Sequence, residues 1–289
     1  MNPKICIVGS ANIDQISYVD TIPSDGETVF GDSYQMGFGG KGANQAVMAG
    51  LLGADVYIIA CLGTDVYNKM TIDNLNNNNV NTDFIQTVDG SSGVAPIWVD
   101  KTGQNRIIVI PGANNLIDAD IAIDSLSDIG TLDVVVGQFE IPLEVNEKVF
   151  EYARNNGVQT VLNPAPAGEV SEKLLNNTSW FIPNEVEFEE MLGEPFNENA
   201  LLKHSKEAKP EIIVTLGEKG CAEVSDGKVY IHQAKKVTAI DTTGAGDAFV
   251  GSFAYGLASK MSKQDSIKLA LEKATKSVTK KGTQSSYKD

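Results

Sequence analysis

The chain has 289 residues, of which 42% are hydrophobic and 21% charged, and its formal net charge is −15 at pH 7. A chain of this length can bury a sizeable core, either as one large α/β domain or as two smaller ones. The acidic balance excludes a broadly basic surface, so we expect no nucleic-acid partner.

No segment has the composition of a membrane span or of a secretory signal. No apolar run approaches the roughly 20 residues that a membrane-spanning helix needs, and the first residues lead directly into a strand-like run. Cys6, Cys61 and Cys221 lie in or beside apolar runs, without the spacing of a metal site. We therefore expect a cytoplasmic protein with buried, reduced thiols and no membrane partner.

Strand-like and helical segments alternate along most of the chain. Strands are expected at residues 4–8, 56–61, 82–88, 134–138, 159–163, 180–183 and 211–216, followed by a hairpin at 221–234. Helical patterns lie between them, for example at 65–75, and a further one runs over 248–257. Alternating units of this kind predict a mostly parallel sheet with helices on both faces.

Four more strand-like runs do not fit that sheet because they carry polar positions or sit between tight turns. They lie at residues 15–20, 28–36, 93–99 and 105–110. We expect them to pair as a small accessory sheet made from two insertions, about residues 15–38 and 93–110. Such a sheet would form a lid over the carboxyl ends of the main strands, where ligands bind in open α/β sheets. No long linker divides the chain, so we expect a single domain, residues 1–289.

The most informative motif is Asp-Thr-Thr-Gly-Ala-Gly-Asp at residues 241–247, between an apolar run and a helical pattern. Its small residues allow a tight turn, and a helix that starts there directs free N–H groups at an anion. Asp247 is then a candidate base that takes a proton from a hydroxyl attacking a phosphoryl group. The alternative is that Asp247 only caps its helix.

Two further motifs place polar side chains after apolar runs. Asn12 and Asp14 combine an amide with a carboxylate, which suits a polyol, although an Asx-type turn is the alternative. The segment 39–44, Gly-Gly-Lys-Gly-Ala-Asn, allows a hinge and opens a helix, so that Lys41 or Asn44 could contact a ligand. Here the alternative is a loop that simply enters a helix.

Other polar residues follow the later strands. Glu140 reads as a ligand contact or as a cap of the next helix. Asn184 and Glu187 have the spacing of a capping box, which is compatible with a place near a triphosphate and Mg²⁺. Thr215 and Gly217 could bring a hydroxyl and an N–H group to a phosphate.

In this order the motifs resemble those of the ribokinase family of carbohydrate kinases, over about residues 5–286. The motifs that carry the resemblance are Asn-x-Asp after the first strand, GGKGAN, NPAPA at 163–167, PNE-x-E, TLG and DTTGAGDAF. The resemblance implies a three-layer α/β/α fold with a β-sheet lid. It also implies transfer of the γ-phosphoryl group of ATP to a sugar hydroxyl, which in the most similar members is O5 of D-ribose.

The resemblance assigns a role to each motif. Asp247 would be the general base, and the anion hole would be formed by the N–H groups of Gly244, Ala245 and Gly246. The sugar would be held, together with Asp247, by Asn12, Asp14, Gly39, Gly40, Lys41, Asn44 and Glu140. The nucleotide would be contacted by Asn184, Thr215, Gly217 and Gly246.

The resemblance also implies two cations. Glu187 would serve the Mg²⁺ network. A monovalent cation, usually K⁺ in this family, would be surrounded by Asp241, Thr243, Ser277, Lys280, Gly282 and Ser286, several of them through carbonyl oxygens. It would favour the conformation of the anion hole without touching substrate.

The sequence departs from the family pattern in two places, and other functions are open. The segment 271–276, usually small and apolar with a residue facing adenine, is charged here, and the residues 287–289 also differ. A kinase of deoxyribose, fructose or adenosine is the nearest alternative, followed by a sugar-binding protein that has lost catalysis. An exposed edge of the lid sheet would favour a homodimer that pairs its lids, as the resemblance also suggests.

Overall fold

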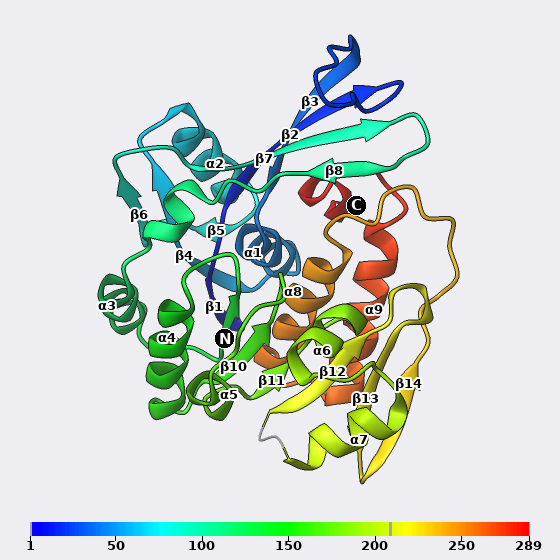
Figure 1. The fold of residues 1–289 in the computed structure, drawn as a ribbon. Helices are drawn as coiled ribbons and strands as arrows, with labels where there is room; N and C mark the ends of the chain where they lie inside the picture. The colour runs from blue at the N-terminus through cyan, green and yellow to red at the C-terminus, as the bar shows by residue number, and fades with distance from the viewer. Residues whose placement is uncertain (1, 208–209, 289) are drawn as a thin grey trace.

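A sheet of ten strands runs through the centre of the protein in the computed structural model, which describes residues 2–207 and 210–288 (Figure 1). The strands in spatial order are β14 (Lys228–His232), β13 (Cys221–Ser225), β12 (Glu211–Thr215), β11 (Trp180–Phe181), β10 (Gln159–Asn163), β9 (Val134–Gln138), β1 (Lys4–Val8), β4 (Asp55–Gly63) and β5 (Val80–Asn81), while β6 (Ile85–Val88) also pairs with β4. All pairings are parallel except those of the hairpin β13–β14 and of β12 with β13. The predicted mostly parallel sheet is therefore confirmed.

Side chains of the central strands alternate between two cores, as the period of two in a strand requires. In β1, Ile5 and Ile7 face one core and Cys6 and Val8 face the other, and all four are fully buried. The first core packs against α1 (Lys41–Leu51), α2 (Val66–Asn76), α8 (Ala245–Ala258) and α9 (Lys263–Ser277). The second packs against α3 (Ala119–Ile129), α4 (Leu143–Asn155), α5 (Glu172–Asn176), α6 (Glu185–Leu192) and α7 (Glu198–Glu207). The three-layer α/β/α arrangement follows.

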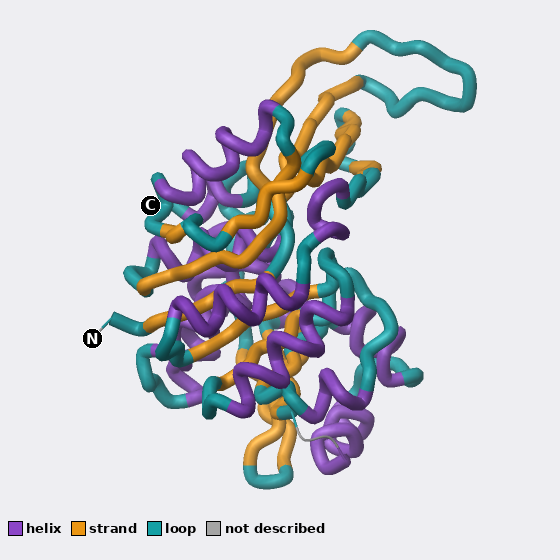
Figure 2. Tube along the Cα trace, turned by 90° about the vertical axis from the view of Figure 1, so that its left-hand side faces the viewer, coloured by secondary structure: helices purple, strands orange, loops and turns teal. Residues whose placement is uncertain are grey.

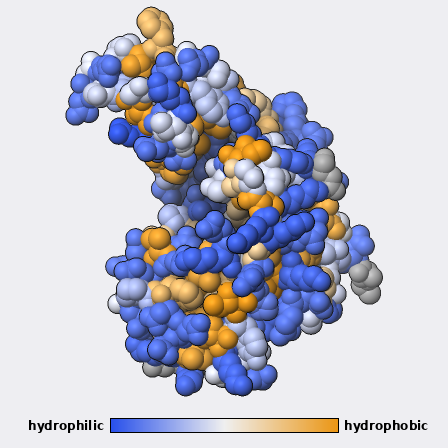
Figure 3. Space-filling model, turned by 90° about the vertical axis from the view of Figure 1, so that its right-hand side faces the viewer, coloured by the Kyte–Doolittle hydropathy of each residue, from blue (hydrophilic) through white to orange (hydrophobic). Residues whose placement is uncertain are grey.

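A separate sheet of four strands stands above the carboxyl ends of the main strands (Figure 1). Its strands in order are β3 (Gly31–Gly39), β2 (Asn12–Val19), β7 (Gly93–Asp100) and β8 (Asn105–Ile107). β2 is parallel to β7 and antiparallel to β3, so the two predicted insertions do pair with each other. We call these strands the small sheet. It extends away from the helical body in Figure 2, and Figure 3 shows a hollow beneath it.

Predicted boundaries differ from the structure mainly where pairing partners end. The strand expected at 28–36 instead spans Gly31–Gly39, because its partner β2 pairs from Val19 opposite Gly31 to Asn12 opposite Gly39. Of the strand expected at 82–88, only Ile85–Val88 forms a strand (β6), because residues 82–84 make a turn after β5. The three cysteines are buried and unpaired, as expected. No helix within the described residues is long and apolar enough for a membrane span.

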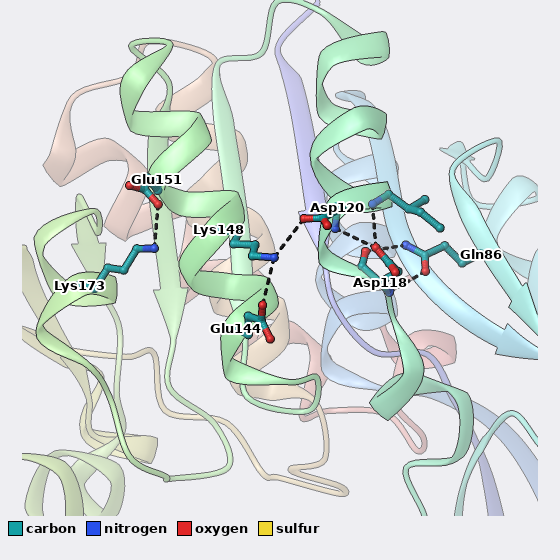
Figure 4. A network of polar contacts seen from close by, with 8 residues as sticks. Gln86, Asp118, Asp120, Glu144, Lys148, Glu151 and Lys173 are labelled. Atoms are coloured by element: carbon teal, nitrogen blue, oxygen red, sulfur yellow. Dashed lines mark hydrogen bonds and ion pairs between the residues drawn. The ribbon is translucent and has the colours of Figure 1, made fainter.

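Exposed ion pairs connect the helices α3, α4 and α5 on one face (Figure 4). Lys148 of α4 lies 3.0 Å from Asp120 of α3 and 3.0 Å from Glu144 of its own helix. Lys173 of α5 lies 2.8 Å from Glu151 of α4. Because these side chains are largely exposed, water and salt screen them and they add little stability. A cluster of buried polar contacts lies elsewhere, at the carboxyl ends of the main strands.

Candidate active site

The first turn of α8 presents free N–H groups to open space. Gly244, the N-cap, has a left-handed backbone (φ +75°), and no side chain caps the helix there. Ala245 donates weakly to the Thr242 carbonyl (3.3 Å), but among the described residues no backbone carbonyl accepts from Gly246. A Cβ placed on Gly246 would have nothing within 4 Å. Free N–H groups and the positive end of the helix dipole make this turn a site for an anion.

Asp247 follows directly and is almost fully buried, with 6% of its surface exposed. Its carboxylate accepts hydrogen bonds from Asn44 (2.8 Å) and Gln45 (3.1 Å), both on α1. Burial raises the pKa of Asp247 above its usual range, although the positive charge of Lys41 and the bond from Asn44 act in the other direction. A carboxylate with a raised pKa is a better proton acceptor for a hydroxyl than an ordinary aspartate.

The two amides that hold Asp247 are themselves held by other buried amides. Gln45 also donates to Asn163 (3.1 Å) and accepts from Gln138 (2.8 Å), at the ends of β10 and β9. The Asn44 oxygen accepts from Gln284 (2.9 Å) in the 3₁₀ turn η3 (Gln284–Tyr287). With Asn12, which is also buried, these residues form what we call the buried polar cluster: Asn12, Asn44, Gln45, Gln138, Asn163, Asp247 and Gln284.

Glu140 reaches the N-terminus of α1 rather than that of α4. Its carboxylate accepts from the Ser10 hydroxyl (2.5 Å) and from the Lys41 backbone N–H (2.9 Å). α4 begins after Pro142 with no side-chain cap, so the interpretation of Glu140 as a cap for α4 is wrong. Burial lowers the pKa of Lys41, but the charges of Asp247, Glu140 and Glu187 together raise it by more, so the net shift of the pKa is upward. The ammonium group therefore stays charged among these carboxylates.

Asn12 and Asp14 lie within β2 and not in a turn. The Asn12 oxygen accepts from Asn114 (2.7 Å), a buried residue of η1 (Gly112–Leu116), which leaves the Asn12 NH₂ group for a further acceptor. Burial raises the pKa of Asp14 to about 6, with smaller contributions from Glu140 and Asp247.

Glycine is required beside these two side chains. A Cβ on Gly39 would lie 2.3 Å from the Asp14 carboxylate. Gly40 has φ +85°, and a Cβ there would lie 2.7 Å from the backbone of Ala11 and Asn12. The paired glycines thus let the start of α1 approach β2 closely.

Asn184 and Glu187 form the predicted capping box at the start of α6. The Glu187 N–H donates to the Asn184 side chain and the Asn184 N–H donates to the Glu187 carboxylate, each across 2.8 Å. Asn184 also bridges to Thr215 at the end of β12, while Gly217 is exposed in the next turn. Burial raises the pKa of Glu187. The bond from the Asn184 N–H and the charge of Lys41 lower it, and the charge of Asp247 raises it. Of these residues, Glu187 lies near enough to Lys41 and Asp247 for their charges to interact.

The loop before α8 packs on the segment after α9. The Asp241 carboxylate accepts from the N–H groups of Thr243 and Gly282, both at 2.9 Å. Ser277 and Ser286 are buried in the same C-terminal segment, whereas the Lys280 side chain is bonded to the Lys288 carbonyl. Within residues 2–207 and 210–288, no three His, Cys, Asp or Glu side chains are placed to hold a metal ion together. The donors available here are carbonyl and hydroxyl oxygens with one carboxylate.

A cavity of about 680 Å³ lies between this loop and α9. Val237, Leu271, Thr275 and Thr279 contribute to its lining, and Lys276 and Glu272 add charged groups. The charged segment 271–276 thus faces a hollow of the size that small ligands occupy. Residues 235–243, which we call the exposed loop, form one border and are almost entirely solvent-exposed.

The sequence analysis gave no role to several residues that the structure places in the site. They are Gln45, Asn114, Gln138, Asn163 and Gln284. The sequence contains a signal for two of them, because Gln138 and Asn163 are polar residues at the ends of apolar strands. Glu140, which was singled out, follows the same strand as Gln138 by two residues. Gln284 has no such signal, because only the folded chain brings it to α1.

Comparison with known proteins defines the class. The model of the pfkB family of carbohydrate kinases matches residues 2–289, and the chain belongs to this family. It is accordingly a phosphotransferase that acts on an alcohol group of a sugar. The predicted family and fold are confirmed.

The relatives include kinases of two sugars. The deoxyribokinase of Salmonella typhi is 36% identical over 291 residues, covering 98% of this chain and 95% of the relative. The ribokinase of Haemophilus influenzae is 38% identical over 293 residues, covering 99% and 95%. The structure of Thermotoga maritima ribokinase is 34% identical, with a TM-score of 0.88 and coverage of 98% and 95%. Arabidopsis thaliana ribokinase complexed with ribose and ATP is 29% identical, with a TM-score of 0.89 and coverage of 99% and 96%.

Proposed function

We propose that the protein transfers the γ-phosphoryl group of ATP to O5 of D-ribose, giving ADP and D-ribose 5-phosphate. One observation carries the proposal: Asp247 is buried and held by two side-chain amides, directly beside the free N–H groups that open α8. A proton acceptor and an anion site thus stand side by side, as phosphoryl transfer to a hydroxyl requires. The relative complexed with ribose and ATP supports the choice of both substrates.

In this proposal the sugar lies against the buried polar cluster under the small sheet. Its hydroxyls exchange hydrogen bonds with Asn12, Asp14, Lys41, Asn44 and Glu140, and Gly39 and Gly40 let the start of α1 approach β2 beside it. Because the Asn12 oxygen is already occupied by Asn114, its NH₂ group is fixed as a donor to the sugar. Fixed donors of this kind discriminate strongly against a sugar that lacks the matching hydroxyl.

The transfer step then needs one proton acceptor and several fixed positive groups. Asp247 takes the proton of O5 while O5 forms its bond to the γ-phosphorus, and the bond from that phosphorus to the oxygen of ADP breaks. The N–H groups of Gly244, Ala245 and Gly246, with the dipole of α8, stabilise the charge on the transferring oxygens. Lys41, kept charged by its carboxylate neighbours, adds a cation at the same place.

The nucleotide lies along the other side of the site. Asn184, Thr215, Gly217 and Gly246 contact its phosphates, and the 680 Å³ cavity beside α9 takes the base. Glu187 would hold Mg²⁺, which when bound neutralises charge on the phosphates. A single carboxylate suits Mg²⁺ because that ion usually binds through one or two carboxylates plus phosphates and waters.

The residues around Asp241 fit a monovalent cation. The bond from the Gly282 N–H to the Asp241 carboxylate joins the loop before α8 to the C-terminal segment. In this proposal Thr243 and, from the C-terminal segment, Ser277, Lys280 and Ser286 contribute further oxygens. Carbonyl and carboxylate oxygens are suitable ligands for a hard cation such as K⁺. When bound, K⁺ supplies a fixed positive charge that holds the loop leading into α8.

We also propose that the chain is a single kinase domain, residues 1–289, with the small sheet as its lid, and that two copies pair through their lids. Phe30, Tyr34 and Met36 of the lid region are exposed, Phe30 by 98%. β3 and β8 are edge strands, and exposed edges with apolar side chains favour association. A molecular mass of one chain at working concentrations would contradict the dimer.

A second candidate, deoxyribose phosphorylation, is favoured by the deoxyribokinase at 36% identity. The test measures ADP formation from Mg-ATP with D-ribose, 2-deoxy-D-ribose, D-fructose or adenosine, each with K⁺ and with Na⁺. We expect the highest kcat/KM with D-ribose and a further increase with K⁺. Faster turnover of another acceptor would overturn the ribose assignment, and equal rates in Na⁺ would overturn the K⁺ site.

A further inference from the structure

Tyr287 closes the back of the turn that begins α8. Its side chain is buried, and its hydroxyl donates to the Gly244 carbonyl across 2.7 Å. The same carbonyl accepts from the Ala248 N–H (2.9 Å), so both of its acceptor positions are used. Since Gly244 has no side-chain cap, the hydroxyl of a residue 43 positions away supplies the contact that holds this peptide group.

A fixed carbonyl fixes the next N–H group. A peptide unit is planar and trans, so the Gly244 carbonyl and the Ala245 N–H point in opposite directions from one rigid plate. Tyr287 pulls the carbonyl toward η3, behind the turn. The Ala245 N–H on this plate therefore points away from η3, where it donates only weakly to the Thr242 carbonyl (3.3 Å), and the unbonded N–H of Gly246 follows on the open side of the turn.

The space around the turn also differs between its two sides. A Cβ on Gly244 would lie 2.3 Å from the Thr283 methyl group and 2.7 Å from the Tyr287 hydroxyl, whereas a Cβ on Gly246 would meet nothing within 4 Å. The turn is therefore packed tightly on one side and free on the other. Rotation of the Gly244 peptide would break the bond to Tyr287 and leave a buried hydroxyl without a partner, which is costly.

The hydroxyl is suited to hold the peptide and not to exchange protons. Burial raises the pKa of Tyr287 well above its usual range, and the charge of Asp247 adds to the shift. The group therefore stays protonated, and remains a donor, at any pH at which the protein works. Its bond points to the backbone behind the turn, so no contact with substrate is required of it.

We propose that Tyr287 is a positioning residue for phosphoryl transfer: its hydroxyl anchors the Gly244 peptide and so aims the N–H groups of the anion site at the transferring phosphoryl group. The inference rests on the proposed function, because it assigns a role within that same step. Removing one anion-hole donor in an enzyme costs roughly 10²–10³-fold in rate. Loss of an anchor behind the donors should cost less, about tenfold in kcat.

The test is Tyr287→Phe, which keeps the buried ring and removes only the hydroxyl. The matched control is Tyr255→Phe, because Tyr255 is a partly buried tyrosine of α8 that we assign no part in the site. We expect Tyr287→Phe to lower kcat about tenfold with KM for D-ribose unchanged, and Tyr255→Phe to behave as the wild type. Affinity for ADP with aluminium fluoride and ribose, a mimic of the transferring phosphoryl group, should fall by the same factor as kcat.

Four outcomes separate the possibilities. A kcat of Tyr287→Phe within twofold of the wild type overturns the inference while leaving the proposed function intact. An equal loss of kcat and of ribose affinity, with a lower melting temperature, shows a structural role only and also overturns it. A change in the pH profile of kcat would make Tyr287 a proton donor or acceptor, contrary to the inference. If the wild type phosphorylates no sugar, the proposed function itself fails.

Discussion

The two sides of the site are built in opposite ways. In the buried polar cluster, each side chain is bonded to another from a distant part of the chain, as Gln45 of α1 is to Gln138 and Asn163. The exposed loop, by contrast, is fixed mainly through Asp241 and the Val278 carbonyl. Buried amide networks are rigid, whereas exposed segments with few contacts open at little cost. The buried polar cluster, where we propose that the sugar binds, is thus already formed in the folded chain, whereas the exposed loop, where we propose that the nucleotide binds, has few contacts of its own.

The largest effect is expected where the buried polar cluster meets the chemistry. Asp247→Asn removes the proton acceptor but keeps the size and polarity of the side chain, so kcat should fall about 10²–10⁴-fold while ribose affinity stays close to that of the wild type. Asp120→Asn, an exposed acid in the first turn of α3, is the control and should leave both unchanged. Steady-state kinetics and ribose titration measure the two quantities. Substantial turnover in Asp247→Asn would contradict the assignment of Asp247 as the proton acceptor.

The next largest effect is expected on the free energy of unfolding, when the packing of the turn before α8 is disturbed. In Gly244→Ala, the left-handed backbone and the clash with Thr283 should together cost about 2–4 kcal/mol in the free energy of unfolding. Gly193→Ala has the same backbone hand (φ +74°) with nothing within 4 Å, and should cost only about 1–2 kcal/mol. Urea denaturation of both variants checks the difference. Equal losses would mean that the packing behind the turn contributes nothing.

A smaller effect should appear as a pH dependence of stability. The pKa of Asp14 is raised from 3.8 to about 6, so the folded state holds this proton more tightly than the unfolded state does. That contribution is fully present below about pH 4 and is lost as the pH rises through 6. Asp14→Asn should therefore be more stable than the wild type at pH 8, by about 2 kcal/mol, with the difference vanishing near pH 4. A gain that is the same at both pH values would contradict this assignment.

The smallest effect is expected on the open side. Val237→Ala in the exposed loop should raise KM for ATP about two- to fivefold, because it removes apolar contact from the cavity, and should change the free energy of unfolding by less than about 0.5 kcal/mol. Val66→Ala, at an exposed position of α2, should change neither quantity. An altered KM for ribose in Val237→Ala would show that the two sides are not separable.

The sequence predicts the framework of the fold better than it predicts the cluster. Residues 4–8, 134–138 and 159–163 form strands with the expected bounds, because uninterrupted apolar runs between turn residues leave few other structures. The glycine-rich start of α8 and the capping box of α6 are also visible as local patterns.

The buried amides could not be found in that way. Gln284 contacts Asn44 across 240 positions, and the contact exists only because η3 folds back onto α1. An amide side chain has no sequence pattern that indicates which distant amide will bind it. The same holds for Tyr287. No local pattern in the sequence indicates that its hydroxyl reaches the Gly244 carbonyl, and only the folded chain shows this contact.

The course of β2 has a mechanical consequence. This strand of eight residues carries Asn12 and Asp14 at its beginning and pairs with β3 and β7 along its whole length, with an irregularity at Tyr18 and Val19. At about 3.3 Å per residue it spans roughly 25 Å, from the site to the outer end of the small sheet. Because Asn12 and Asp14 are paired within this sheet, a tilt of the sheet would shift these two side chains, and a ligand held by them would oppose the tilt. Movement of the small sheet and binding at Asn12 and Asp14 are therefore coupled through one strand.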